Sequence, residues 1–130
     1  MEELRIIIAG GRDFENYFLL KTSAIEIMSK KIPFPYEAVI ISGMARGADK
    51  LGVRFANEMG LKLYRFPAEW ERLGKRAGYV RNTEMAKFAS EGDNKGMLIA
   101  FWDGKSKGTQ HMIDTAKRYG LEVHIVNYSS

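Results

Sequence analysis

Short apolar runs rich in β-branched residues alternate along the chain with longer segments whose apolar residues recur every three or four positions. The short runs predict buried strands, and the longer segments predict amphipathic helices. This alternation is typical of strand–helix–strand units around a mainly parallel sheet, so the sequence predicts the α/β class. The five expected strands are residues 4–9, 38–42, 62–66, 97–101 and 123–126.

Helices are expected between these strands, and we interpret their apolar stripes as core positions rather than cofactor contacts. The stripes are Phe18, Thr22, Ile25 and Met28; Ala48, Leu51, Phe55 and Met59; Met85, Phe88 and Ala89; and Met112, Ala116 and Tyr119. Pro33 and Pro35 are expected to end the first helix, because proline cannot continue one. Residues 67–82 are predicted to form a long polar and aromatic loop, and loops of that length are often functional.

Composition mainly excludes classes of protein. A chain of 130 residues is expected to be a single domain, residues 1–130, that buries roughly two-thirds of its unfolded surface. It has no cysteine and only His111 and His124, so we expect no disulfide and no metal site, and we assign both histidines to packing or the surface. No signal pattern and no apolar stretch near ~20 residues is present, so a cytoplasmic protein without membrane contact is expected.

Three segments with glycine and polar residues follow predicted strands: residues 10–13, 42–49 and 102–109. Because the carboxyl ends of parallel strands meet at one edge of a sheet, we expect these segments to converge. Gly10 and Gly11 allow a sharp turn beside a ligand, and Arg12 can pair with a phosphate; a tight turn with Arg12 facing water explains the pattern equally well. The net charge of +4 suits an anionic ligand but is equally typical of a solvated surface.

The second segment has the pattern of a strand, a glycine turn and a helix N-terminus. Backbone N–H groups around Gly43 and Gly47, together with the helix dipole, can hold a phosphate, and Arg46 can neutralise it. The segment matches neither a Walker loop nor the GxGxxG fingerprint. Asp49 is expected in the first helical turn, where a structural role is favoured over a catalytic one. A nucleotide site is therefore the first hypothesis.

Two further segments carry candidate ligand contacts. Gly108 and Thr109 offer backbone N–H groups at the start of the last helix, although Ser106 or Thr109 can equally be an ordinary N-cap. Trp70 and Tyr79 can stack on a base, or simply pack the long loop onto the domain. Arg81 and Asn82 are expected at a helix start, where they can meet phosphate or ribose.

Several of these motifs together resemble one family. They are Gly-Gly-Arg-Asp-Phe at 10–14, Ser-Gly-Met-Ala-Arg-Gly-Ala-Asp at 42–49, Phe-Pro-Ala-Glu-Trp at 66–70 continuing to Gly74-Lys75, Ala77-Gly78 and Arg81-Asn82 with Met85, and Asp103-Gly104 with Gly108-Thr109. In this order they resemble the SLOG superfamily, most closely its YspA-like, YpsA-related branch from bacteria and phages. The resemblance covers essentially the whole chain.

The resemblance implies a Rossmann-like three-layer sandwich with sheet order 3-2-1-4-5. It also implies a pocket for a nucleotide-derived phosphorylated ligand of the NAD, ADP-ribose or nucleoside phosphate class, held by a sensor or sequestering protein. The positions that match the family's loops are Gly10, Gly11, Arg12, Gly43, Arg46, Gly47, Asp49, Arg81, Asn82, Gly108 and Thr109. Trp70 and Tyr79 join them as candidate base contacts, and Asp103 as a candidate ligand contact.

One departure bears on catalysis. The related LOG-type phosphoribohydrolases carry Pro-Gly-Gly-x-Gly-Thr-x-x-Glu in the last motif, whereas Met112 stands at the glutamate position here. Loss of such a group costs about 10²–10⁴-fold in rate, and Asp49, Glu84 or Asp103 replaces it only if the geometry allows. Binding is therefore ranked first, hydrolysis of an N-glycosidic or phosphate bond second, and single-stranded DNA binding of the DprA type third. A homo-oligomer is expected only from fold analogy.

Overall fold

The computed structural model describes residues 2–31 and 36–129, so the expected loop at Pro33 and Pro35 lies outside the described residues. The elements run β1 (Glu3–Gly10), α1 (Tyr17–Ser29), β2 (Glu37–Ser42), α2 (Ala48–Met59), β3 (Lys62–Arg65), α3 (Trp70–Leu73), a 3₁₀ turn (Gly74–Arg76), α4 (Ala77–Ala89), β4 (Lys95–Trp102), α5 (Lys107–Arg118) and β5 (Glu122–Asn127). No helix within the described ranges is both long and apolar enough to cross a membrane.

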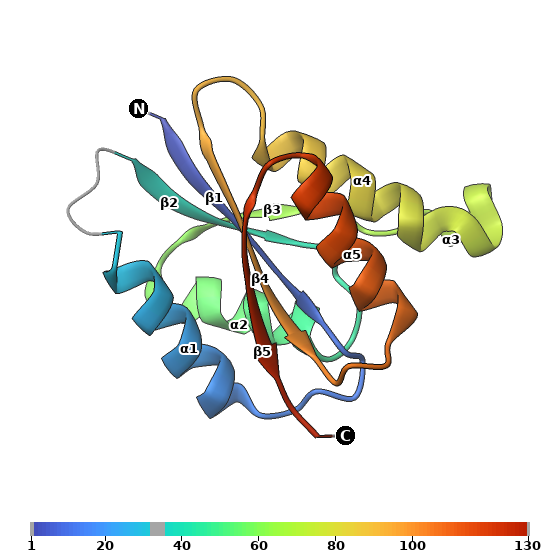
Figure 1. Ribbon diagram of the computed structural model, residues 1–130, viewed down its shortest axis with the longest axis horizontal. Coiled ribbons are helices and arrows are strands. Elements are labelled where there is room, and N and C mark those ends of the chain that lie inside the picture. Colours follow the sequence, from blue (N-terminus) through green and yellow to red (C-terminus); the bar gives the residue numbers. More distant parts are fainter. Residues whose placement is uncertain (1, 32–35, 130) are drawn as a thin grey trace.

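The five strands form one parallel sheet in the order β3-β2-β1-β4-β5, as Figure 1 shows. The predicted order and all five predicted strands are confirmed, each strand to within two residues at either end. Every pairing is parallel, so the sheet is more regular than the mainly parallel one expected. The register aligns Gly10 of β1 with Phe101 of β4, which brings the loops after these strands to the same edge.

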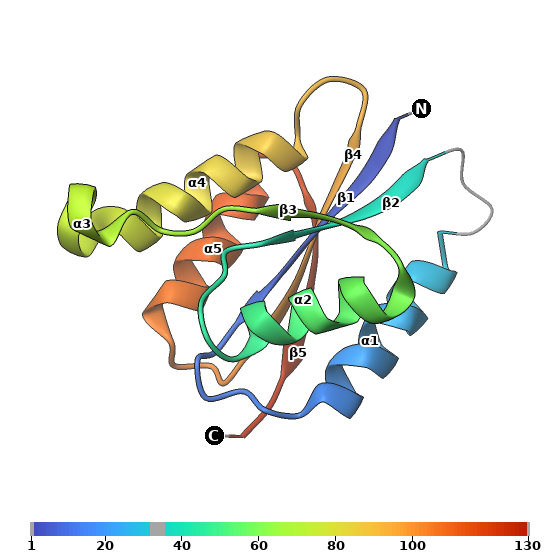
Figure 2. The same ribbon diagram turned by 180° about the vertical axis from the view of Figure 1, so that it is seen from behind.

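Helices cover both faces of the sheet, which confirms the three-layer sandwich. Helices α1 and α2 pack on one face, where Ile6, Phe55 and Phe101 belong to the core, and α4 and α5 pack on the other (Figures 1 and 2). Adjacent β1 residues therefore enter opposite cores, as Ile6 and Ile7 do. This double coverage explains why the central strands read as continuous apolar runs.

Of the four residues in the predicted stripe of α1, only Met28 packs against the core. Phe18 is 77% exposed and Ile25 is 40% exposed, and the helix buries Leu20 and Ala24 instead. The helix is apolar around most of its circumference, so spacing alone did not identify the inward face.

Two other stripe positions are also exposed: Met59 and Tyr119 lie at the ends of α2 and α5, next to solvent. The stripe positions fully buried within the core are Ala48, Phe55, Met85, Ala89, Met112 and Ala116.

The segment 67–82 is not a long loop. It contains the short helix α3 and a 3₁₀ turn, and α4 already begins at Ala77. Gly78 is close to the Trp70 ring: a Cβ added there would lie 3.4 Å from it. Figures 1 and 2 show α3 at the end of α4, beyond the edge of the sheet. As a result Tyr79 lies in the first turn of a helix rather than before one, and Arg81 and Asn82, which were expected at a helix start, lie in its second turn.

Candidate functional site

The three loops expected to converge meet around one cavity of about 710 Å³ at the carboxyl edge of the sheet. Helices α3 and α4 contribute a further wall. Twelve of the fourteen candidate residues line this cavity: Gly10, Gly11, Arg12, Arg46, Asp49, Trp70, Tyr79, Arg81, Asn82, Asp103, Gly108 and Thr109. Residues from five separate segments are thus brought to one place.

The other two candidates lie elsewhere. Gly43 lines a neighbouring hollow of about 690 Å³. Gly47 lines neither hollow; it precedes α2 with a positive φ of 80°, and a Cβ there would overlap the carbonyl oxygen of Gly11. The next residue, Ala48, donates its N–H to that same oxygen at 3.1 Å. The position of Gly47 therefore serves close packing of two loops rather than contact with the cavity.

The turn after β1 is anchored to Phe101 of β4. The N–H of Gly11 donates to the carbonyl of Phe101 at 3.0 Å, and the buried ring of Phe14 stacks on Phe101 with centroids 4.9 Å apart. This anchoring leaves Arg12 exposed at the rim, with its guanidinium 5.9 Å from the centroid of the Trp70 ring. Arg12 therefore faces the cavity and not open solvent alone.

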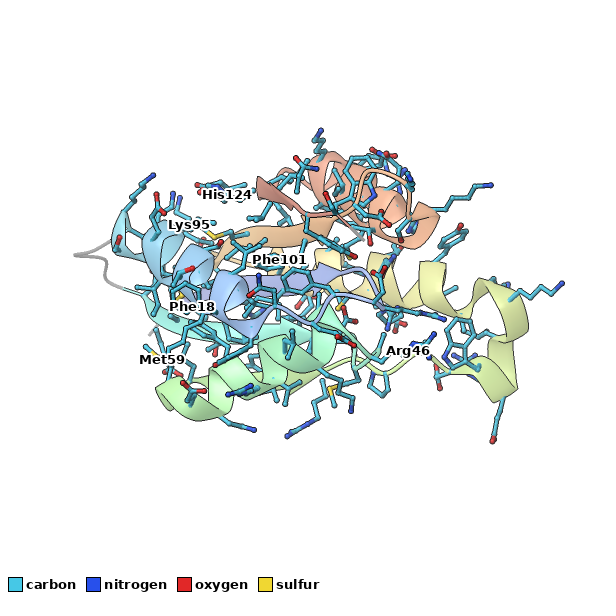
Figure 3. All side chains as sticks on the ribbon, turned by 90° about the horizontal axis from the view of Figure 1, so that it is seen from below. Phe18, Arg46, Met59, Lys95, Phe101 and His124 are labelled. Atoms are coloured by element: carbon cyan, nitrogen blue, oxygen red, sulfur yellow. The ribbon has the colours of Figure 1, made fainter. Side chains whose placement is uncertain are left out.

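The loop between β2 and α2 is organised by Ser42. Its hydroxyl donates to the carbonyl of Asp49 at 3.0 Å and accepts from the N–H of Met44 at 3.1 Å. Met44 has a φ of 65°, and this left-handed conformation costs a non-glycine residue on the order of 1–3 kcal/mol. The exposed Arg46 follows, at the same end of the molecule as α3 and far from Phe18 and Met59 (Figure 3).

Asp49 is the buried carboxylate of the cavity, with only 4% of its surface exposed. Its carboxylate accepts from the N–H of Ala45 at 3.3 Å and also from the N–H of Gly10. Burial raises the pKa of Asp49 to about 6, although these N–H groups and the charge of Arg81 favour the ionised form. Asp49 therefore ties the β2–α2 loop to the end of β1.

Arg81 lies across the backbone of Gly43. Its Nη1 donates to the carbonyl of Gly43 at 2.5 Å, and its Nε donates to Oδ1 of Asn82 at 3.1 Å. Burial lowers the pKa of Arg81, and the nearby charge of Arg12 lowers it further, while Asp49 opposes both effects. Arg81 is therefore a cation held in place by two hydrogen bonds, and the second cation near it, Arg12, also lines the cavity.

The side-chain amide of Asn82 also contacts His111 on α5. Its Nδ2 lies 3.2 Å from Nδ1 of His111 and 3.4 Å from the carbonyl of Gly108. Since the amide donates, His111 Nδ1 accepts, and burial favours this neutral ring by lowering the pKa of His111. The ring of Tyr79 stacks on His111 with centroids 4.3 Å apart.

Sequence reasoning assigned His111 to packing or the surface. Its stacking on Tyr79 is a packing contact, whereas its contact with Asn82 could not be predicted from a local pattern, because Asn82 lies on a different helix.

The start of α5 is capped by Ser106, not Thr109. The hydroxyl of Ser106 accepts from the N–H and from the hydroxyl of Thr109, at 3.4 and 3.2 Å. Asp103 holds the turn before it by accepting from the N–H groups of Lys105 and Ser106, at 2.8 and 2.9 Å. A Cβ on Gly108 would meet no atom within 4 Å, so this part of the helix borders open space.

Of the three carboxylates considered for catalysis, two lie at the cavity and one does not. Asp49 and Asp103 line the cavity, as does Met112 at the position of the LOG glutamate, whereas Glu84 is exposed on α4 and does not. Lys75, which belongs to the motif shared with the family but was not among the candidate ligand contacts, also lines the cavity. Among residues 2–31 and 36–129, no group of three or more His, Asp or Glu side chains could hold a metal ion.

Comparisons with known proteins identify the family of the chain. The chain is 30% identical over 125 residues to the Gene 61 protein of Mycobacterium phage D29, an alignment that covers 92% of this chain and 93% of that protein. No solved structure matches the chain significantly. The model of the YspA, cpYpsA-related SLOG family matches residues 4–73, which include β1, the β2–α2 loop and α3. The chain therefore belongs to the YspA, cpYpsA-related SLOG family.

Proposed function

We propose that the protein binds a phosphorylated nucleotide derivative, of the NAD, ADP-ribose or nucleoside phosphate class, at the carboxyl edge of its sheet. One observation carries the proposal: Arg12, Arg46 and Arg81 all line the cavity, and none forms an ion pair with another described residue. Membership of a SLOG family supports a nucleotide-related ligand. A sensor or a sequestering protein is the role that such binding fits.

The electrostatics favour an anion between these cations. Arg12 and Arg81 repel each other, and the carboxylate of Asp49, which attracts Arg81 and is mostly ionised at neutral pH, is one negative charge against three guanidinium groups. A guanidinium can hold a phosphate through two parallel hydrogen bonds. Asn82 is available for a sugar hydroxyl, and Trp70 or Tyr79 for the face of a base.

The proposal is tested by thermal unfolding with a panel of AMP, ADP, ADP-ribose, NAD and cyclic nucleotides. A ligand at ~100 times its Kd adds about 2.7 kcal/mol, which at ~2.1 cal/mol/K per residue raises the Tm by about 10 °C. Arg81→Gln is expected to abolish the shift. Arg76→Gln removes the same charge from an exposed residue outside the cavity lining, and it should keep the shift. Absence of any shift with wild-type protein contradicts the proposal.

Hydrolysis of the ligand is a second candidate, favoured by Asp49. A carboxyl group that lines the cavity with a pKa of about 6 can exchange a proton near neutral pH. Incubation with nucleoside monophosphates and NAD, followed by chromatography, separates this candidate from binding alone. Free base or released phosphate, lost in Asp49→Asn, supports hydrolysis, and unchanged compounds reject it for the panel.

A further inference from the structure

The cavity and its neighbouring hollow share one wall. The first hollow has a volume of about 710 Å³ and reaches the start of α5, and the second has about 690 Å³ and extends toward Pro67. The residues that line both are Arg12, Ala45, Arg46, Trp70 and Arg81. All three arginines therefore belong to the shared wall, next to both hollows.

The two hollows differ in chemistry beyond that wall. The second is lined, outside the shared residues, by Gly43, Met44, Pro67 and Ala68, none of which is charged. With the Trp70 indole they make an apolar setting suited to a flat ring. The first hollow instead presents groups that pair with hydroxyls. They include Asn82, Asp103, Ser106 and Thr109.

This arrangement selects among phosphorylated ligands. Each hollow alone lies within the usual range for a ligand pocket, ~300–1,000 Å³, so a mononucleotide would occupy one hollow and leave the other to water. A ligand that uses both hollows needs its anionic group at the middle, against the arginines, and a different group on either side. The strained backbone of Met44 on the second hollow is consistent with a site shaped for a ligand.

We propose, as an extension of the nucleotide-binding function above, that the ligand is a nucleoside diphosphate joined to a second hydroxylated group. The base occupies the hollow of Met44, Pro67 and Ala68, and the diphosphate lies against Arg12, Arg46 and Arg81. The second hydroxylated group occupies the hollow at the start of α5.

The test compares the affinities of the full chain for AMP, ADP and ADP-ribose, measured by isothermal titration calorimetry. Wild-type protein is expected to bind one ADP-ribose per chain, at least tenfold more tightly than AMP or ADP. Two variants fill one hollow each: Gly108→Leu projects into the first and Ala68→Leu into the second. Both should weaken ADP-ribose at least tenfold, and Gly108→Leu should thereby reduce the preference for ADP-ribose over AMP.

A control variant places leucine on the same helix outside the lining: Gln110→Leu should match wild type for every compound. Equal affinity for AMP and ADP-ribose, two molecules bound per chain, or full ADP-ribose affinity in Gly108→Leu would each overturn the two-hollow ligand while leaving nucleotide binding intact. Failure of wild-type protein to bind any of the three compounds would overturn the proposed function itself. The wild-type comparison stands even if a filled variant does not fold.

Discussion

A single methyl group on Gly43 is expected to displace the side chain of Arg81 without any substitution at position 81. In Gly43→Ala the new Cβ would lie 2.6 Å from Nη1 of Arg81 and 2.9 Å from its Cδ and Cζ, distances that real Cβ atoms do not show. The guanidinium is the end of a flexible side chain, so it moves and the backbone stays. It then loses its hydrogen bond to the Gly43 carbonyl.

The magnitude follows from that hydrogen bond. A hydrogen bond with a charged partner contributes about 1.5–3 kcal/mol, so Gly43→Ala should destabilise the fold by no more than roughly this amount. If Arg81 pairs with the ligand phosphate from its present position, the same range corresponds to an affinity loss of roughly 10- to 100-fold. Urea unfolding measures the first quantity, and isothermal titration with ADP-ribose measures the second.

A double-mutant cycle separates displacement of Arg81 from other effects of the methyl group. Gly43→Ala should weaken binding in wild type but have almost no further effect in an Arg81→Ala background. Independent, additive losses would refute the reasoning, because they would mean that the methyl group acts through something other than Arg81. Unchanged affinity in Gly43→Ala alone would refute it as well.

Three further predictions concern the cavity wall. The pKa of Asp49 is raised to about 6 in the folded chain from an ordinary 3.8, so the unfolded chain loses this proton at lower pH than the folded chain does. The free energy of unfolding should therefore fall by roughly 3 kcal/mol as the pH rises from about 4 to 6. Urea unfolding of Asp49→Asn should lack this pH-dependent component. His111→Phe keeps a ring against Tyr79 but removes the acceptor for Asn82, so ADP-ribose affinity should fall about fivefold, as for a hydrogen bond of ~1 kcal/mol, and wild-type affinity would contradict this. Met44→Gly relieves the left-handed strain and should change stability by less than about 1 kcal/mol, whereas Met44→Val should destabilise by about 1–3 kcal/mol in the same assay.

The sheet could be predicted because its information is local. Apolar runs such as Ile6 to Ile8 have only one place in a globular α/β chain, buried between two helix layers. Convergence of the glycine loops followed from parallel topology alone. Helix faces were harder to predict, because the nearly continuous apolar surface of α1 left the choice between Phe18 and Leu20 to packing against the sheet.

The contacts within the site could not be predicted from the sequence, because they join residues that come together only in the folded chain. The start of α4 was missed because Gly78 weakens the local helical signal, while packing of Trp70 against that turn is a tertiary contact. His111 acquires its position from Asn82 and Tyr79 on another helix, and Gly47 from the backbone of Gly11. No spacing in the sequence encodes these pairings. They are also the contacts that orient the cavity's side chains.

The central claim, an anion site at the carboxyl edge of the sheet, is tested most directly by amide NMR of the ¹⁵N-labelled chain titrated with ADP-ribose. The account predicts saturable shifts concentrated at residues 10–13, 43–47, 78–82 and 103–109, the segments around the arginine wall. A third hollow lies elsewhere, lined by Lys30, Lys95 and Glu122, and Figure 3 shows Lys95 well away from Arg46. Shifts centred there, or no shifts at millimolar ligand, would contradict the account.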